Sequence, residues 1–147
     1  MGQRSIARKD FRYMLSLGGG RSLRSTARKP IMAAILIVED DVLANEHLEF
    51  ILQQAGYEVL SATSADEAAE LLEDHEDVRL IVTDINLPGT MNGLKLAAAA
   101  KARRPEMNII IVTGYSAPKN DEIPPGSLFV PKPYNARKMI GAVRHFQ

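Results

Sequence analysis

The 147-residue sequence contains no cysteine, which excludes disulfides, thiolate catalysis and Cys-based zinc sites and fits a cytoplasmic location. It also has no apolar run near the roughly 20 residues that a membrane span needs. Only three histidines are present, His47, His75 and His145, and they lack the spacing of metal ligands. We expect each of them to lie on a helix surface. With 46% hydrophobic and 24% charged residues, the chain has the composition of one ordinary globular domain.

The net charge is zero, but the two signs are distributed unevenly along the chain. Residues 1–31 carry eight basic side chains and one acidic side chain, a net charge of +7. Residues 32–147 carry 10 basic and 17 acidic side chains, a net charge of −7. We therefore expect residues 1–32 to be a basic, flexible N-terminal extension. Three alternatives stay open: an organellar transit peptide, an arm that contacts nucleic acid, and an over-extension upstream of a true start at Met32.

From residue 33 onward, short apolar runs alternate with helical patterns. Strands alternating with helices predict right-handed crossovers and a parallel sheet that is covered on both faces. The fold class is therefore α/β, with three layers in the order α/β/α. Segment 117–125 holds three prolines, so we expect mostly loop there, with a turn or two of helix at most. The expected strands are 34–38, 57–60, 78–83, 108–112 and 127–130, and the expected helices are 43–55, one opening at a capping box in 64–67, 94–104 and one capped by Asn135.

Polar side chains follow four of these strands, at the edge where open parallel sheets bind ligands. Glu39 and Asp40 follow the first strand, Asp84 follows the third, Thr113 the fourth and Lys132 the fifth. Carboxylates that close together repel one another unless a hard cation such as Mg²⁺ joins them. A carboxylate can also attack phosphorus, while a hydroxyl group and an ammonium group stabilise phosphoryl oxygens. The strand ends therefore predict a Mg²⁺-dependent phosphoryl site with Asp84 as its nucleophile.

The residues around these strand ends form motifs: ILIVEDD at 35–41, VTDINLPG at 82–89 with NG at 92–93, VTGY at 112–115 and FVPKP at 129–133. Through these motifs, residues 33–147 resemble a response-regulator receiver domain of two-component signalling. The resemblance covers about 115 residues and all of the active-site positions. It implies a flavodoxin-like, doubly wound fold with a five-stranded parallel sheet in the order 2-1-3-4-5.

The resemblance also implies how the acidic residues work. Asp84 would accept a phosphoryl group from a phosphohistidine, carried by a sensor histidine kinase or a histidine phosphotransfer protein. Asp40 and Asp84 would bind Mg²⁺ directly. The backbone carbonyl of Asn86 would be a third ligand, and Glu39 would act mostly through water.

The remaining motif residues would hold the phosphate and transmit its arrival. Thr113 and Lys132 would contact the phosphoryl group, and Phe129 would be the aromatic residue that turns inward when Thr113 moves. The peptide bond after Lys132 would be cis. Two features depart from the family pattern: Gly114 stands where alanine is common, and a proline-rich loop replaces much of the usual fourth helix, whose face normally carries dimerisation and partner binding.

The sequence ends directly after its last expected helix, so we expect a single-domain regulator. It would signal to a downstream protein partner or serve as a phosphate sink or relay, with a homodimer as an option. Its net charge of −7 disfavours nucleic acid as a partner. It would catalyse only its own phosphorylation and dephosphorylation. Two alternatives are a Mg²⁺-dependent phosphatase, which would need an acid where Asn86 stands, and a receiver-like scaffold that is never phosphorylated.

Overall fold

The computed structural model describes residues 34–115 and 117–147. The basic extension expected for residues 1–32 lies outside the described residues. The five strands are all parallel and stand in the order β2-β1-β3-β4-β5, which confirms the expected flavodoxin-like fold. In chain order the elements are β1 (Ala34–Val38), α3 (Val42–Gln54), β2 (Val59–Ala62), α4 (Ala65–Asp74), β3 (Val78–Asp84), α5 (Gly93–Arg103), β4 (Asn108–Thr113), the 3₁₀ turn η1 (Asn120–Glu122), β5 (Leu128–Pro131) and α6 (Ala136–His145).

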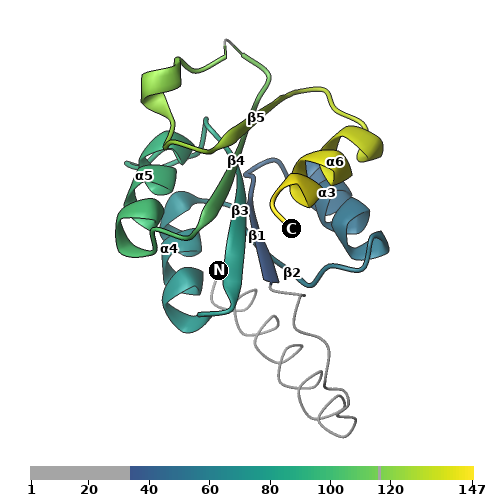
Figure 1. Ribbon diagram of the computed structural model, residues 1–147, viewed down its shortest axis with the longest axis horizontal. Coiled ribbons are helices and arrows are strands. Elements are labelled where there is room, and N and C mark those ends of the chain that lie inside the picture. Colours follow the sequence, from purple (N-terminus) through teal and green to yellow (C-terminus); the bar gives the residue numbers. More distant parts are fainter. Residues whose placement is uncertain (1–33, 116) are drawn as a thin grey trace, which may run out of the picture. The chain divides into compact units, whose positions relative to one another are not determined.

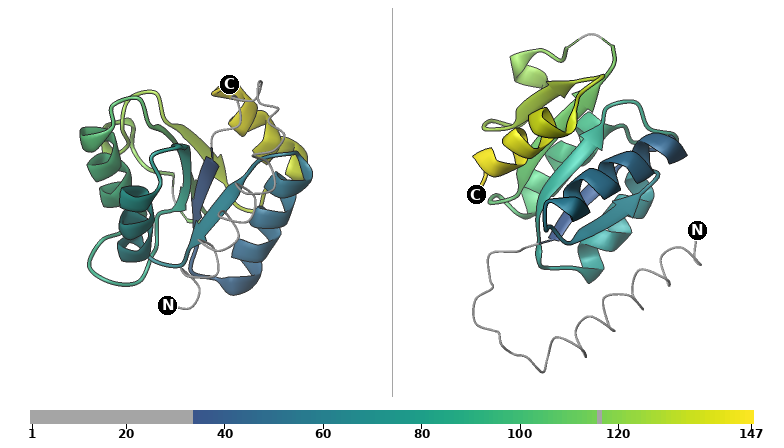
Figure 2. Two further views of the ribbon diagram at one scale, coloured as in Figure 1. Left: turned by 90° about the horizontal axis from the view of Figure 1, so that it is seen from below. Right: turned by 90° about the vertical axis from the view of Figure 1, so that its right-hand side faces the viewer.

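The sheet is the middle of three layers, with α3 and α6 on one face and α4 and α5 on the other (Figures 1 and 2). Because successive side chains of a strand point to opposite faces, each central strand contributes to two separate cores. Leu36 and Ile81 pack on the side of α4 and α5. Their chain neighbours Ile37 and Val82 pack on the side of α3 and α6. Burial on both faces explains why these strands read as unbroken apolar runs.

Each described α-helix begins directly after a capping side chain. The caps accept hydrogen bonds from backbone N–H groups in the first helical turn, and each such bond contributes about 1 kcal/mol. The four capping residues are Asp41, Ser64, Asn92 and Asn135. The two that precede α3 and α5 fix the loops that carry the acidic strand ends.

Two expectations from the sequence are wrong in detail. The second strand runs from Val59 to Ala62, not over residues 57–60, because the backbone N–H of Tyr57 donates to the Leu52 carbonyl (3.1 Å) in the turn that ends α3. His75 is buried instead of lying on a helix surface. Its Nδ1 lies 2.9 Å from the Leu71 carbonyl, so the ring forms a hydrogen bond with the last turn of α4.

The segment between β4 and β5 is mostly loop, as expected from its prolines. Its one helical element among the described residues is the single turn η1. Ile123, just after η1, packs against the same core cluster as Phe129 and so replaces part of the apolar cover that a longer helix would give. Among the described helices, none combines the length and apolarity needed to cross a bilayer.

Candidate active site

Three carboxylates meet at the C-terminal ends of β1 and β3. The two strands are neighbours, with Val38 paired to Thr83, so Glu39 and Asp84 leave the sheet side by side. One carboxylate oxygen each from Glu39, Asp40 and Asp84 lie within 4.8 Å of one another. A group of oxygen donors this close fits a hard divalent cation such as Mg²⁺, and it contains none of the nitrogen or sulfur ligands that zinc prefers.

Lys132 joins this cluster from the end of β5. Its Nζ donates to Glu39 Oε1 (2.7 Å) and to Asp84 Oδ2 (2.9 Å). The peptide bond between Lys132 and Pro133 is cis. Burial alone would lower the pKa of Lys132, but the hydrogen bonds and charges of both carboxylates raise it above its ordinary value, so the ammonium group stays charged. Burial raises the pKa of Glu39, and the bond from Lys132 opposes that rise.

Asp84 is held on several sides yet is still reachable. Its Oδ1 accepts from the backbone N–H of Asn86 (3.1 Å), and Oδ2 accepts from Lys132. The hydroxyl of Thr83 donates to the backbone carbonyl of Asp84 (2.9 Å). About 10% of the Asp84 side chain is exposed. A carboxylate that is fixed in orientation but open to solvent on one side is suited to receive a group from a partner.

Gly93 permits the close approach of α5 to the Asp84 backbone. A Cβ atom on Gly93 would lie only 1.9 Å from the Asp84 carbonyl oxygen and 3.0 Å from the Ile85 Cα. The Gly93 N–H also donates to the Ile85 carbonyl (2.8 Å). No other residue type fits here without moving the helix away from the strand end.

Thr113 and Phe129 lie on the neighbouring strands β4 and β5. Thr113 is buried, and its Oγ1 accepts from the backbone N–H of Tyr115 (3.2 Å). Phe129 is half-buried, pairs with Ile111 and packs on the core side of α4 and α5. Their roles as phosphate contact and switch stay predictions. Gly114 has room for a methyl group, since a Cβ there would lie 3.7 Å from the Lys132 Cβ.

The sequence reasoning missed Asn45, on the first turn of α3. This side chain is 1% exposed and donates to the carbonyl of Glu39. A signal was present, because Asn45 lies three residues before Leu48 and seven before Leu52, on the expected buried face of the helix. A polar residue on a buried face indicates a specific hydrogen-bonding task.

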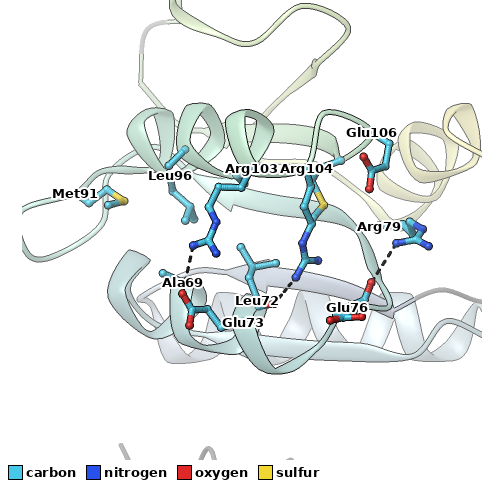
Figure 3. Close-up of a pocket in the computed structure, with 13 residues that line it drawn as sticks. Ala69, Leu72, Glu73, Glu76, Arg79, Met91, Leu96, Arg103, Arg104 and Glu106 are labelled. Carbon is cyan, nitrogen blue, oxygen red and sulfur yellow. Dashed lines mark hydrogen bonds and ion pairs between the residues drawn. The ribbon is translucent and has the colours of Figure 1, made fainter.

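A separate cavity of about 560 Å³ lies between α4 and α5 (Figure 3). Arg103, at the end of α5, contacts Glu73 across it, and Arg104, directly after the helix, contacts the Leu72 carbonyl of α4. Its lining includes Met107, just before β4, so it extends toward the sheet edge opposite the carboxylates. None of the strand-end residues predicted for the phosphoryl site lines this cavity.

A family model described as the response regulator receiver domain matches residues 35–144. The chain therefore belongs to the response regulator receiver domain family of two-component systems. Domains of this family bind Mg²⁺ at an acidic cluster, accept phosphate from histidine kinases and act on downstream partners. The family is not one of conventional enzymes.

Curated relatives agree with this assignment. The chain is 34% identical over 122 residues to the transcriptional regulatory protein AruR of Pseudomonas aeruginosa, covering 76% of this chain and 48% of AruR. It is 31% identical over 118 residues to the aerobic respiration control protein ArcA of Escherichia coli, covering 76% of this chain and 47% of ArcA. The chain thus spans about half the length of these relatives. Because one of them is a transcriptional regulator, the expectation that nucleic acid is not a partner gains no support.

Solved structures show the same fold. A receiver protein from Sinorhizobium medicae superposes with a TM-score of 0.74 at 27% identity, covering 78% of this chain and 94% of that one. A CheY-like receiver domain from Methanospirillum hungatei superposes with a TM-score of 0.69 at 32% identity, covering 78% of this chain and 92% of that one. The regulator TrrA of Thermotoga maritima, solved in complex with Mg²⁺-BeF, superposes with a TM-score of 0.70 at 28% identity, covering 79% of this chain and 100% of that one.

Proposed function

We propose that Asp84 accepts a phosphoryl group from a phosphohistidine of a sensor histidine kinase or histidine phosphotransfer protein in a Mg²⁺-dependent reaction. The observation that carries this proposal is the environment of Asp84. One carboxylate oxygen faces the Lys132 ammonium, the other faces the Asn86 N–H, and two further carboxylate side chains lie beside it. Lone turn acids are common, but an acid fixed in this way at a ligand-binding sheet edge is not.

In the proposed step an oxygen of the Asp84 carboxylate forms a bond to phosphorus while the bond from phosphorus to the donor imidazole nitrogen breaks. The imidazole nitrogen keeps the electron pair of the broken bond and takes up a proton. Lys132 already lies 2.9 Å from Asp84 Oδ2 and would balance charge on the transferred oxygens. Thr113 lies at the end of the adjacent strand. Its hydroxyl would donate a hydrogen bond to the same phosphoryl group once it no longer accepts from the Tyr115 N–H.

Mg²⁺, when bound, would neutralise charge on the phosphoryl oxygens and relieve the repulsion among the carboxylates. Asp40 and Asp84 would bind it directly, the Asn86 carbonyl would add a third ligand, and Glu39 would contribute through water. Glu39 is suited to this indirect role because its Oε1 already bonds Lys132 and its Oε2 accepts from the Asp41 N–H (3.1 Å).

Replacing Asp40 by alanine is expected to remove most of the Mg²⁺ affinity, because it leaves one directly bound side chain, Asp84. Titration calorimetry with MgCl₂ measures the loss, which we expect to be at least about tenfold in the dissociation constant. Asp121→Ala, which removes an exposed acid on η1 outside the carboxylate cluster, is the matched control and should bind like the wild type. Unchanged affinity in Asp40→Ala would contradict the proposed ligand set.

Replacing Lys132 by alanine is expected to allow some phosphorylation of Asp84 but to uncouple it from the conformation of β5. Lys132 is the direct link between Asp84 and this strand, because it follows Phe129 by three residues and its N–H donates to the Thr113 carbonyl (3.0 Å). The NMR signals of Thr113 and Phe129 should shift with a phosphate analogue in the wild type only. The same shifts in Lys132→Ala would rule out this role.

Incubating the protein with MgCl₂ and acetyl phosphate separates the proposed function from its two alternatives. A receiver gains one phosphoryl group per chain, stable to acid and labile to base. A phosphatase converts many equivalents of acetyl phosphate without retaining one, and a scaffold does neither. Asn86 stands two residues after Asp84, where the phosphatase needs a second acid. Asparagine at this position therefore favours the receiver over the phosphatase.

We further propose that phosphorylation changes the surface presented to a downstream protein partner, or that the domain acts as a phosphate sink or relay. The shortened segment between β4 and β5 leaves η1 and Ile123 where a longer helix would shape the surface. Single-domain action stays a prediction, since the chain covers 48% of the length of AruR. A homodimer and a cytoplasmic location also stay predictions.

A further inference from the structure

We propose that Asn45 is a positioning residue of the metal site, which holds the loop of Glu39, Asp40 and Asp41 in its ligand-binding shape. This inference rests on the proposed function, because it assigns a residue that acts on the proposed Mg²⁺ ligands without touching the ion. Asn45 Nδ2 donates to the carbonyl of Glu39 (2.9 Å) and to the carbonyl of Ala62 at the end of β2 (3.2 Å).

The orientation of the Asn45 amide follows from its neighbours. Both contacted groups are carbonyl oxygens, which only accept, so the NH₂ end must face them. The other end, Oδ1, is buried without a hydrogen-bond partner among the described residues. An unpaired buried acceptor costs about 1–3 kcal/mol. The fold bears this cost, so the two donated bonds are the contribution that distinguishes asparagine from an apolar residue here.

Asn45 fastens both ends of the acidic loop. Its side chain holds the carbonyl of Glu39 at the start, and its backbone N–H donates to the carbonyl of Asp41 at the end (2.9 Å). The Glu39 N–H donates to the same Ala62 carbonyl that Asn45 contacts (3.0 Å). The loop is therefore attached to the edge strand β2 through one shared acceptor. Asp40 lies between the two fixed points and is exposed, so its position depends on them.

Removing the amide leaves the Glu39 carbonyl without its side-chain donor and removes the side-chain link between the start of the loop and β2. Asp84 keeps its contacts with the Asn86 N–H and with Lys132, which lie outside this loop. The expected effect is thus specific: weaker Mg²⁺ binding in a protein that is still folded. Partners that orient metal ligands typically cost about 10–100-fold in affinity when they are lost.

The test is a MgCl₂ titration of the full chain by calorimetry, comparing wild type, Asn45→Ala and Leu48→Ala. Leu48 is on the same helix and is 3% exposed, so Leu48→Ala destabilises α3 through the core without touching the loop. We expect the dissociation constant of Asn45→Ala to rise about tenfold or more and that of Leu48→Ala to stay within about twofold. Equal affinity of Asn45→Ala and wild type overturns the proposal, as does an equal loss in both variants.

A measurement on the wild type covers the case in which Asn45→Ala does not fold. The side-chain NH₂ protons of Asn45 should exchange slowly with solvent, and their NMR signals should shift when MgCl₂ is added. Fast exchange, or signals that do not respond while those of Asp40 do, overturns the proposal. If the wild type itself shows no Mg²⁺ binding, the proposed function fails instead, and the two failures are thereby distinguished.

Discussion

Replacing Asp84 by asparagine is expected to abolish phosphorylation by acetyl phosphate and Mg²⁺ while leaving the protein folded. The amide nitrogen cannot attack phosphorus as a carboxylate oxygen does, so the loss should be complete within detection. Asparagine keeps one acceptor, which can serve the Asn86 N–H or Lys132 but not both. Relief of repulsion from Glu39 offsets part of that loss, so we expect the free energy of unfolding to change by about 1 kcal/mol or less.

Intact-mass spectrometry measures the phosphoryl group, and urea denaturation measures the stability of the same samples. Asp121→Asn is the matched control, because it makes the same change at an exposed residue of η1 outside the carboxylate cluster. The control should be phosphorylated like the wild type. A phosphoryl group on Asp84→Asn at the wild-type level would show that the acceptor lies elsewhere.

Replacing Gly93 by alanine is expected to lower the free energy of unfolding by about 3 kcal/mol, the upper part of the range for overpacking. The added methyl group would collide with the backbone of Asp84 and Ile85, which cannot rotate away as a side chain could. Helix α5 must therefore move from the end of β3, and Asp84 moves with its support. Phosphorylation of the folded fraction should slow as well.

Gly141→Ala is the control for Gly93→Ala, because it makes the same change inside a helix without a collision. Gly141 lies in α6, and a Cβ there would have no atom within 4 Å. Alanine is the better helix former, so this variant should gain up to about 1 kcal/mol in the free energy of unfolding. Urea denaturation compares the two. If Gly93→Ala were as stable as the wild type, the close approach of α5 to Asp84 would be wrong.

The sequence predicted the fold well because periodicity and local signals agree in this chain. Unbroken apolar runs such as 35–38 mark strands that are buried on both faces, and the capping residues Ser64 and Asn135 mark where two of the helices begin. Where prediction failed, local contacts at the ends of helices decided. Tyr57 follows the end of α3 and its N–H donates to the Leu52 carbonyl, and the buried ring of His75 lies beside the Leu71 carbonyl. The apolar period that marks helices and strands does not reveal these contacts.

The strand-end residues could be predicted because the carboxyl ends of parallel strands meet at one edge of a sheet. The contacts that hold these residues in place could not be predicted. That Lys132 bonds both Glu39 and Asp84 depends on distances across several strands, and that Gly93 touches the Asp84 carbonyl depends on the position of a whole helix. Asn45 gave only a weak signal, a polar residue on an apolar face, and its task became clear only from its two acceptors.

The location of the phosphoryl group tests the central claim most directly. The full-length wild type is treated with MgCl₂ and acetyl phosphate and then reduced with borohydride, which converts a phosphorylated aspartate into homoserine. Peptide mass spectrometry identifies the converted residue. Conversion at Asp84 alone, dependent on Mg²⁺, is the predicted result. Conversion at Asp40 or another acid, or none in a protein that binds Mg²⁺, would contradict the assignment of Asp84 as the phosphoryl acceptor.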